Sequence, residues 1–432
     1  MSSKTHYIDR LHNLIDDEYE ARACKDIDDD ACKVVPGNYL LITISLVLSK
    51  VADTFASAKV VLPWLMASTG APLFLTSLLV PIREAGSMLP QLLLGAYIRH
   101  KPVRKGFLVL GALLQALMIA GLGLVAMHLS GVTAGVVIVT LTAFFSLARA
   151  ISSIANKDVI GKTIPKQQRG RLSGKAASIA GFISIGFGAV LMYGLAEDGG
   201  VSYLLILAVI CFAASAAGYG LIKEYSGATE GAVKGIQVAF KNLRLLHDDV
   251  DFARFVLVRG FMISSGLAAP YFVLMAQAQQ SSMLQSLGLL IIVSGIASFI
   301  SGSIWGRMAD QNSKRLMTST AMLNALICLL GAVTALTTPA NIYIYLGLFF
   351  ALSIVHEGVR QGRKTYLVDM AKGEKRTDYV SVSNTLIGFL LLVVGLFSGV
   401  IAQLSIVAVM LFFTVSSILA ALLSVRLKNV SQ

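Results

Sequence analysis

Residues 106–128 read GFLVLGALLQALMIAGLGLVAMH and contain no Lys, Arg, Asp or Glu. About 20 predominantly apolar residues are enough to carry an α-helix across the hydrocarbon core of a bilayer. A helix that is apolar on every side has no face for water, so it must lie in lipid or inside a large core. The stretch therefore predicts a transmembrane helix.

The same pattern recurs along most of the chain. Its 432 residues are 56% hydrophobic and only 14% charged, with a mean hydropathy of +0.74. Soluble domains carry about 25% charged residues, so this chain has too few charges to cover a water-facing surface. We predict an all-α integral membrane protein with about twelve transmembrane helices. Their expected ranges are 39–60, 73–98, 106–128, 131–156, 174–195, 201–222, 253–276, 284–306, 316–337, 341–359, 382–400 and 403–425.

Basic residues concentrate in every second loop between these helices. The ranges Arg99–Lys105, Lys157–Lys175, Arg307–Arg315 and Arg360–Arg376 are rich in Lys and Arg, whereas the alternate loops contain essentially none. Loops that stay in the cytoplasm carry the excess of Lys and Arg. This asymmetry predicts an inner-membrane protein of a bacterium with both termini in the cytoplasm. It also explains the net charge of +12 without a nucleic-acid partner.

The chain divides into two similar halves. The sequence ALLQA at 112–116 has a counterpart, AMLNA, at 321–325 in the corresponding helix of the second half. Duplicated halves of this kind are common in secondary transporters. The predicted parts are an acidic tail at 1–37, a six-helix half at 38–222, a cytoplasmic loop at 223–252, a six-helix half at 253–427 and a short C-terminus at 428–432.

The four cysteines and the other reactive side chains suggest no chemistry of their own. Cys24 and Cys32 flank an acidic run without a metal-ligand spacing, and we expect reduced thiols in a cytoplasmic tail. Cys211 and Cys328 fall in apolar helices, where core packing is expected. There is no phosphate-binding loop, metal cluster or nucleophilic triad, so we predict no cofactor, no bound metal and no enzymatic activity.

The loop after the eighth predicted helix carries the most specific motif. Residues 306–315 read GRMADQNSKR, which resembles the G-x-x-x-D-[RK]-x-G-[RK]-[RK] motif of the major facilitator superfamily, with Gln311 and Ser313 as departures. The motif also lies between the second and third helices of a half, as in that family. Residues 95–105, GAYIRHKPVRK, form a degraded copy in the first half, with Arg99 in place of the aspartate. The resemblance covers roughly residues 38–428.

The resemblance implies two six-helix halves around a central cavity, which rock to expose it to either side. It implies that the first helix of each triplet lines the cavity and that the third faces lipid. It also implies that Asp310 stabilises the outward-facing state through basic residues at the end of the tenth helix. The implied gating residues are Gly306, Asp310, Lys314, Arg315, Arg360 and Arg363, with Gly95 and Arg104 in the first half.

Charged side chains within the predicted helices follow the same division. The third, sixth, ninth and twelfth helices have no Lys, Arg, Asp or Glu in their interiors. A charge near the bilayer centre costs several kcal/mol, so it is expected to face a cavity or a partner. Because this sorting coincides with the implied cavity, we predict a substrate and coupling site. Its candidate residues are Lys50, Asp53, Arg83, Glu84, Arg149, Arg259, His356 and Glu357.

Two interpretations of the central charges stay open. Arg83 with Asp53, or Lys50 with Glu84, would form ion pairs that hold helices together. Alternatively, one carboxylate binds the proton that is coupled to transport, with Asp53 favoured over Glu84. Small residues at four-residue spacing predict close helix packing. They are Ser294, Ser298 and Gly302, Gly395 and Gly399, and Ala177 and Gly181.

These observations predict a secondary active transporter. We expect a monomer that moves a small organic solute, with an anionic or zwitterionic one favoured by the four central and near-central cations, Lys50, Arg83, Arg149 and Arg259. Its other partners would be the lipid bilayer and protons, through symport or exchange. A proton-driven exporter of lipophilic drugs and a membrane sensor without transport are the competing classes.

Overall fold

The structure is a computed structural model that describes residues 32–192, 200–226, 244–278, 283–337, 341–370 and 375–430. Every regular element in these ranges is a helix. The helices of the first half are α3 (Val35–Phe55), α4 (Val61–Ser68), α5 (Leu73–Ser77), α6 (Leu79–Met88), α7 (Gln91–Arg99), α8 (Lys105–His128), α9 (Gly131–Thr163), α10 (Lys166–Met192) and α11 (Gly200–Leu221). The second half contains α13 (Leu245–Asp248), α14 (Val250–Phe261), α15 (Ser264–Leu267), α16 (Ala269–Gln277), α17 (Met283–Leu336), α18 (Ile342–Met370), α19 (Lys375–Leu404) and α20 (Ile406–Val425).

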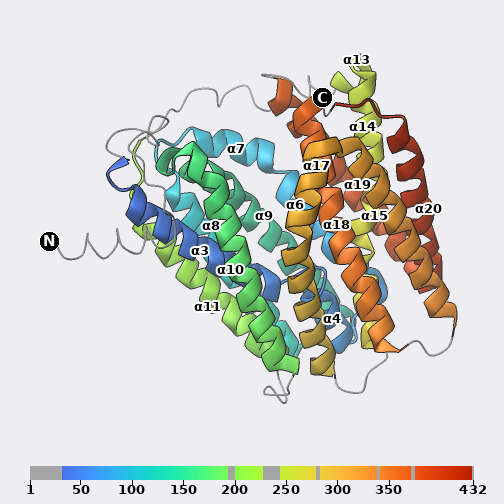
Figure 1. The fold of residues 1–432 in the computed structure, drawn as a ribbon. Helices are drawn as coiled ribbons and strands as arrows, with labels where there is room; N and C mark the ends of the chain where they lie inside the picture. Colours follow the sequence, from blue (N-terminus) through green and yellow to red (C-terminus); the bar gives the residue numbers. More distant parts are fainter. Residues whose placement is uncertain are drawn as a thin grey trace.

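The helices form two groups that lie side by side (Figure 1). Helices α3 to α11 pack on one another in the first group, and α14 to α20 pack on one another in the second. The two groups meet where α10 contacts α17, where α19 contacts α5 and α6, and where α16 contacts α4. Most of the predicted tail, and most of the predicted loop between the groups, lies outside the described residues.

About twelve membrane-spanning helices were expected, and the bounds of those observed differ from the predicted ones. Ten helices in the described ranges are long and apolar enough to cross a bilayer, and Leu287–Ser301 is a shorter apolar stretch. The segment from α5 to α7 is broken near Leu78 and near Pro90. Pro81 and Pro90 cannot donate a backbone hydrogen bond to the residue four positions earlier, which interrupts the helix at both places. The range of α17 contains the eighth and ninth predicted helices, which are separated by a break in helical geometry at Asn312 (φ −160°, ψ 94°).

The predicted end of the first helix at residue 60 is wrong. The chain leaves helical geometry after Phe55 but resumes it in α4, which continues to Ser68. Lys59 lies in the break, with its backbone N–H donating to the Ser57 hydroxyl at 3.3 Å. Breaks of this kind are tolerated within a membrane protein where they line a polar cavity. The break therefore places a cation in the interior of the bundle.

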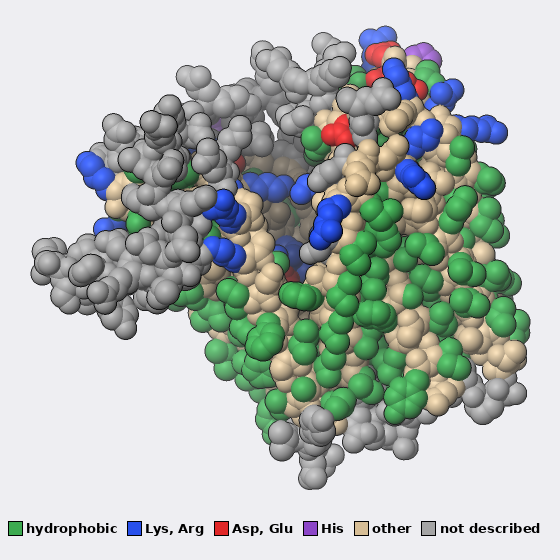
Figure 2. Space-filling model, viewed as in Figure 1, with side chains coloured by type: hydrophobic (Ala, Val, Ile, Leu, Met, Phe, Trp, Pro, Cys, Tyr) green, Lys and Arg blue, Asp and Glu red, His purple; other side chains and the backbone are tan. Residues whose placement is uncertain are grey.

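Apolar side chains cover the outer faces of the bundle. Large exposed residues run along α8, α11, α20 and the second part of α17, for example Leu117, Ile210, Leu326 and Leu422. Figure 2 shows such side chains over the flank of the second group, below a rim of Lys and Arg. An apolar surface of this extent is favourable in contact with lipid and unfavourable in contact with water. These four helices are the ones predicted to face the bilayer.

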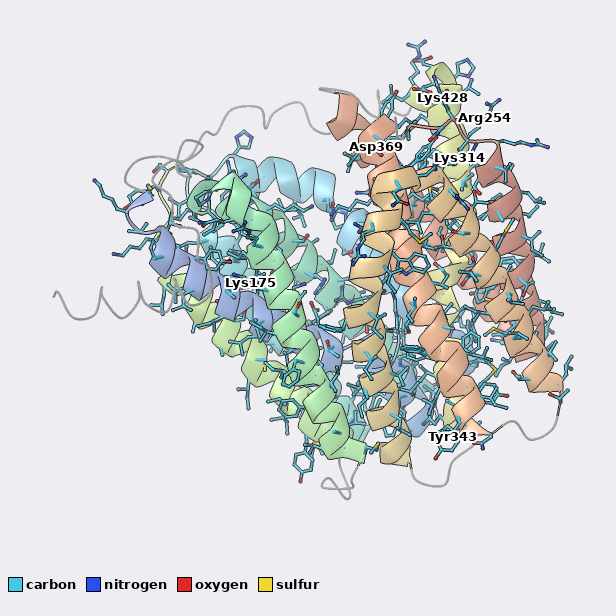
Figure 3. All side chains as sticks on the ribbon, viewed as in Figure 1. Lys175, Arg254, Lys314, Tyr343, Asp369 and Lys428 are labelled. Carbon is cyan, nitrogen blue, oxygen red and sulfur yellow. The ribbon has the colours of Figure 1, made fainter. Side chains whose placement is uncertain are left out.

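Charged residues gather at one end of the bundle. Arg254, Lys314 and Lys428 lie at one end of the second group, and Tyr343 lies at the other (Figure 3). The α7–α8 connection and the end of α9 belong to the same charged end. We refer to it as the basic end of the bundle. It is the end expected in the cytoplasm.

A buried carboxylate joins several segments at the basic end. The side chain of Glu224 is 0% exposed and accepts hydrogen bonds from the backbone N–H groups of Arg104 and Lys105, at 2.6–3.0 Å. Glu224 also pairs with Lys162 Nζ at 2.9 Å, while the Arg104 guanidinium pairs with Asp158 at 3.0 Å. A carboxylate at the first turn of a helix also gains from the helix dipole. Glu224 thus ties α8 and α9 to the segment that follows α11.

Glycines bring the two groups together at the end opposite the basic one. A Cβ atom at Gly288, near the start of α17, would lie 2.6 Å from the carbonyl oxygen of Gly188 on α10. One at Gly395 of α19 would collide with the ring of Pro81 on α6. At these points α10 packs closely against α17, and α6 against α19. At the basic end the molecule is hollowed between the groups, with Lys and Arg side chains on its walls (Figure 2).

The cysteines differ in part from expectation. Cys211 and Cys328 are free and buried in the helical core, as predicted. Cys32 takes part in a disulfide bond, so the prediction of a reduced thiol at that position is wrong. Cys24 lies outside the described residues.

The contact at Gly288 predicts a stability difference between two alanine variants. Gly288→Ala forces α17 away from the backbone of α10, and overpacking of this kind costs about 1–3 kcal/mol. Gly186→Ala is the matched control, since a Cβ at that position of α10 has nothing within 4 Å. We expect the melting temperature of the purified protein to fall for Gly288→Ala and to stay unchanged or rise for Gly186→Ala. Equal melting temperatures would contradict the tight contact.

The orientation is tested by labelling single cysteines in a background without the native ones. Asn341→Cys should react with a membrane-impermeant maleimide in intact cells, because it lies at the end opposite the basic one. Lys101→Cys, in the exposed α7–α8 connection, should react only after the membrane is permeabilised. Labelling of Lys101→Cys in intact cells would reverse the orientation.

Candidate functional site

A cavity with two adjoining lobes lies between the two groups of helices. One lobe has a volume of about 240 Å³ and the other about 300 Å³, and both are lined by Lys59, Ser265 and His356. We call the first the hydroxyl lobe, since its wall contains Thr54, Ser57, Ser265, Ser294, Ser298 and Ser353. We call the second the basic lobe, since its wall contains Lys59, Arg83, Arg149, His356, Arg360 and Arg363.

Asp53 is the centre of an ion-pair network in the first group. Its carboxylate accepts a hydrogen bond from Arg83 Nη2 at 3.0 Å and pairs through its other oxygen with Arg149. The three residues come from α3, α6 and α9. The Arg83 guanidinium also lies 4.7 Å from the centre of the Phe145 ring, a favourable cation–π distance. The expected Arg83–Asp53 pair is therefore present, with Arg149 as a second partner.

The pair is well shielded on one side and accessible on the other. The Arg83 side chain is 11% exposed and the Asp53 side chain 17%, whereas Arg149 is 37% exposed. Arg149 also lines the basic lobe. A ligand that enters the cavity thus reaches Arg149 more easily than it reaches Arg83.

A hydrogen-bonded chain crosses between the groups through His356. Lys59 Nζ lies 2.8 Å from His356 Nε2, and Ser265 Oγ lies 3.1 Å from His356 Nδ1. The Ser265 hydroxyl donates to the carbonyl of Met262 at 3.0 Å, so it accepts from Nδ1–H. His356 Nε2 is then the acceptor for the Lys59 ammonium group. This arrangement requires a neutral imidazole.

Lys59 was not among the predicted site residues, although it forms the hydrogen bond to His356 that joins the two groups. The predicted helix ended at residue 60, which placed this lysine at the membrane surface. The apolar run VVLPWLMA at 60–67 directly after Lys59 was the available signal. It continues the span and moves Lys59 inward.

Three further charged side chains complete the walls. Glu84 lines the basic lobe and Glu357 the hydroxyl lobe. Arg360 Nη1 donates to Glu357 Oε1 at 2.7 Å, one turn away on α18. Together the two lobes are lined by five Lys and Arg side chains and three carboxylates, an excess of two positive charges with His356 neutral. A poorly solvated cavity with such an excess attracts anions.

Two of the predicted cavity residues lie elsewhere. Lys50 is on α3 one turn before Asp53 and lines neither lobe. Arg259 is 5% exposed and also lies outside both lobes. Its guanidinium donates to Ser383 Oγ at 2.6 Å and to Asn384 Oδ1 at 2.8 Å, which ties α14 to α19.

The predicted gating residues are spread over both groups. Asn312 breaks the helix just after Asp310 and accepts a hydrogen bond from the backbone of Arg315 at 2.8 Å. The side chain of Asp310 lies outside the described part of the structure. Arg360 and Arg363 line the basic lobe. Lys314 lies at the basic end (Figure 3).

The remaining gating residues show no shared contact. A Cβ at Gly95 or at Gly306 would meet nothing within 4 Å. Arg104 is engaged by Asp158 and lies beside Glu224. Within the described residues, no group of three His, Cys, Asp or Glu side chains is placed to hold a metal ion.

Solved transporter structures share this arrangement of helices. A D-xylose–proton symporter superimposes with a TM-score of 0.66 and 14% identity, covering 91% of this chain and 98% of its own. The partially occluded inward-open xylose transporter XylE from E. coli gives a TM-score of 0.67 and 13% identity, covering 93% and 99%. The nucleoside transporter NupG gives 0.65 and 11%, covering 90% and 98%. At these identities the likeness concerns the fold alone.

The sequence comparison gives the family. No curated protein matches the chain in sequence. The sequence profile of the Major Facilitator Superfamily matches residues 44–350 and 260–431, which include helices of both groups. The chain is therefore an all-helical multi-pass membrane protein that belongs to the major facilitator superfamily of secondary transporters.

Proposed function

We propose that the protein moves a small organic anion across the bacterial inner membrane by alternating access, coupled to protons. The observation that carries this proposal is the cavity between the groups, with its excess of two positive charges and with Asp53 held between Arg83 and Arg149. We propose that it works as a monomer with both termini in the cytoplasm.

The anion and Asp53 compete for the same cation. Arg149 is the more exposed partner of Asp53, and it lines the lobe with the most positive charge. When an anionic group binds Arg149, the Asp53 carboxylate loses one of its two cations. A carboxylate in a poorly solvated site is unfavourable without a partner and is neutralised by a proton instead. Anion binding and proton binding therefore favour each other, which is the coupling that symport requires.

Rocking of the two groups supplies the second half of the cycle. The glycine contacts of α17 with α10 and of α19 with α6 close the end opposite the basic one. The Lys59–His356 hydrogen bond is a smaller contact between the groups, within the cavity. In this conformation the solute exchanges with the basic end. Exposure to the other side requires the glycine contacts to separate and the walls of the basic end to meet.

The competing classes make different demands on the cavity. An exporter of lipophilic compounds needs a mainly apolar wall, whereas eight charged Lys, Arg, Asp and Glu side chains line these two lobes. A sensor without transport would bind a ligand but show no flux. Reconstitution into proteoliposomes separates a sensor from a carrier directly.

Asp53→Asn tests the coupling. Uptake of a panel of radiolabelled organic acids by the wild-type protein is first measured in proteoliposomes with an imposed pH gradient. The acid that the wild type accumulates is then the substrate in the same assay of the variant. We expect Asp53→Asn to reduce accumulation to the equilibrium level while exchange of labelled for unlabelled anion continues, because the anion site is retained and the proton site is lost.

Asp251→Asn is the matched control. Asp251 forms an exposed pair with Arg254 at 3.7 Å, and such surface pairs contribute at most about 1 kcal/mol. Its accumulation should equal that of the wild type. Full accumulation in Asp53→Asn together with its loss in Glu84→Gln would transfer the proton site to Glu84. Full accumulation in both variants would make these carboxylates helix-pairing groups only.

A further inference from the structure

The two lobes differ in chemistry, and their difference specifies the solute. We propose that the cargo is a hydroxylated organic anion, with its anionic head in the basic lobe and its hydroxylated body in the hydroxyl lobe. Sugar acids and sugar phosphates share this chemistry. The inference rests on the proposed function and adds the class of solute to it.

The hydroxyl lobe is rich in hydrogen-bond acceptors. The hydroxyl groups of Thr54, Ser265, Ser294 and Ser353 each donate to a backbone carbonyl three or four residues earlier in the chain, at 2.8–3.1 Å. A hydroxyl whose proton is engaged in this way still offers oxygen lone pairs. The lobe therefore favours a solute that presents several donors.

Neutral hydroxyl donors fit this lobe better than an ammonium group. The two carboxylates on its wall, Asp53 and Glu357, are already paired with arginines. Lys59 also stands on this wall and would repel an ammonium group. Phe349 and Leu352 supply apolar surface in the same lobe. Acceptors beside apolar surface suit the alternating O–H and C–H groups of a polyol or sugar.

The basic lobe is suited to one strongly anionic head. Arg149, Arg360 and Arg363 present guanidinium groups, whose planar donors match a carboxylate or a phosphate. Arg363 forms no ion pair within 4.0 Å with a carboxylate of the described residues, so its charge is available. The excess of two positive charges over both lobes matches a phosphate monoester, which carries a charge of about −1.5 to −2 near neutral pH.

The lobes are close enough for one solute to occupy both. Lys59, Ser265 and His356 belong to both walls, so the two lobes lie on either side of this hydrogen-bonded chain of three side chains. Lys59 uses one of its three N–H donors on His356 and retains two for an anionic head at the junction. The basic lobe, at about 300 Å³, reaches the lower end of the range of small-ligand pockets, and the hydroxyl lobe adds about 240 Å³ to it.

The test separates the two features by matched ligands on the purified full-length protein. Dissociation constants are measured by calorimetry for glucose 6-phosphate, gluconate, glucose, hexyl phosphate and hexanoate. We expect glucose 6-phosphate or gluconate to bind at least about tenfold more tightly than glucose, which lacks the charge. We expect the same advantage over hexyl phosphate or hexanoate, which lack the hydroxyl groups. Glucose loses the charged hydrogen bonds to the protein, and the hexyl compounds lose the neutral ones. The ranking of glucose 6-phosphate against gluconate distinguishes a phosphate head from a carboxylate head.

Variants assign each feature to its lobe. Arg363→Gln should weaken the tighter hydroxylated anion about tenfold or more, and Arg363→Lys should restore part of the affinity. Ser294→Ala combined with Ser353→Ala should weaken the same ligand and leave the matched hexyl phosphate or hexanoate unchanged. Arg254→Gln, an exposed arginine at the basic end (Figure 3), is the charge-matched control and should change nothing. Melting curves confirm that each variant is folded.

Several outcomes would overturn the proposal. One is equal affinity for glucose 6-phosphate and hexyl phosphate, or for gluconate and hexanoate, and another is tighter binding of glucose than of either anion. A third is an unchanged affinity in Arg363→Gln. If none of these ligands binds while another organic acid is accumulated with protons, the solute class is wrong and the proposed transport stands. If the hydroxylated anion binds but no flux follows, the proposed transport is wrong and the binding site stands.

Discussion

A charge near the centre of a bilayer costs several kcal/mol. The other features of the cavity depend on how the central charges are paired and solvated. Asp53 is stable there because Arg83 and Arg149 approach its two oxygens from different helices. The carboxylate in turn neutralises one of the two guanidinium groups. The network keeps a net positive charge that faces the cavity, where water or an anionic solute completes its solvation.

A helix break and several glycine contacts shape the cavity that this ion-pair network faces. The break between α3 and α4 brings Lys59 into the interior, where it meets His356 of the other group at 2.8 Å. The close approaches at Gly288 and Gly395 bring the two groups into contact. A buried ion pair by itself would only hold helices together. Because this network faces a cavity between the two groups, a bound ligand can change its pairing.

The sequence predicted the helices and the class of protein well because the cost of exposing polar groups to lipid acts on every residue. It also predicted that Asp53, Arg83 and Arg149 face the interior. It placed Arg259 in the cavity, whereas this side chain bonds to Ser383 and Asn384. A linear pattern gives the depth of a residue, but the rotation of its helix about the axis depends on packing.

Other features were missed or misassigned. The helix break beside Lys59 contains neither proline nor glycine, and the apolar run at 60–67 that continues the span was not joined to the first helix. Ser294 was predicted as part of a packing row, yet it lines the hydroxyl lobe, whereas Gly395 does pack against Pro81.

The proposed coupling requires that an anion displaces Asp53 from a cation and thereby makes it take up a proton. Calorimetry of anion binding in buffers of different ionisation enthalpy measures this uptake directly, with a carboxylate ligand that stays ionised above pH 7. We expect proton uptake on binding in the wild type and none in Asp53→Asn. Binding without proton uptake in the wild type, or equal uptake in both proteins, would contradict it.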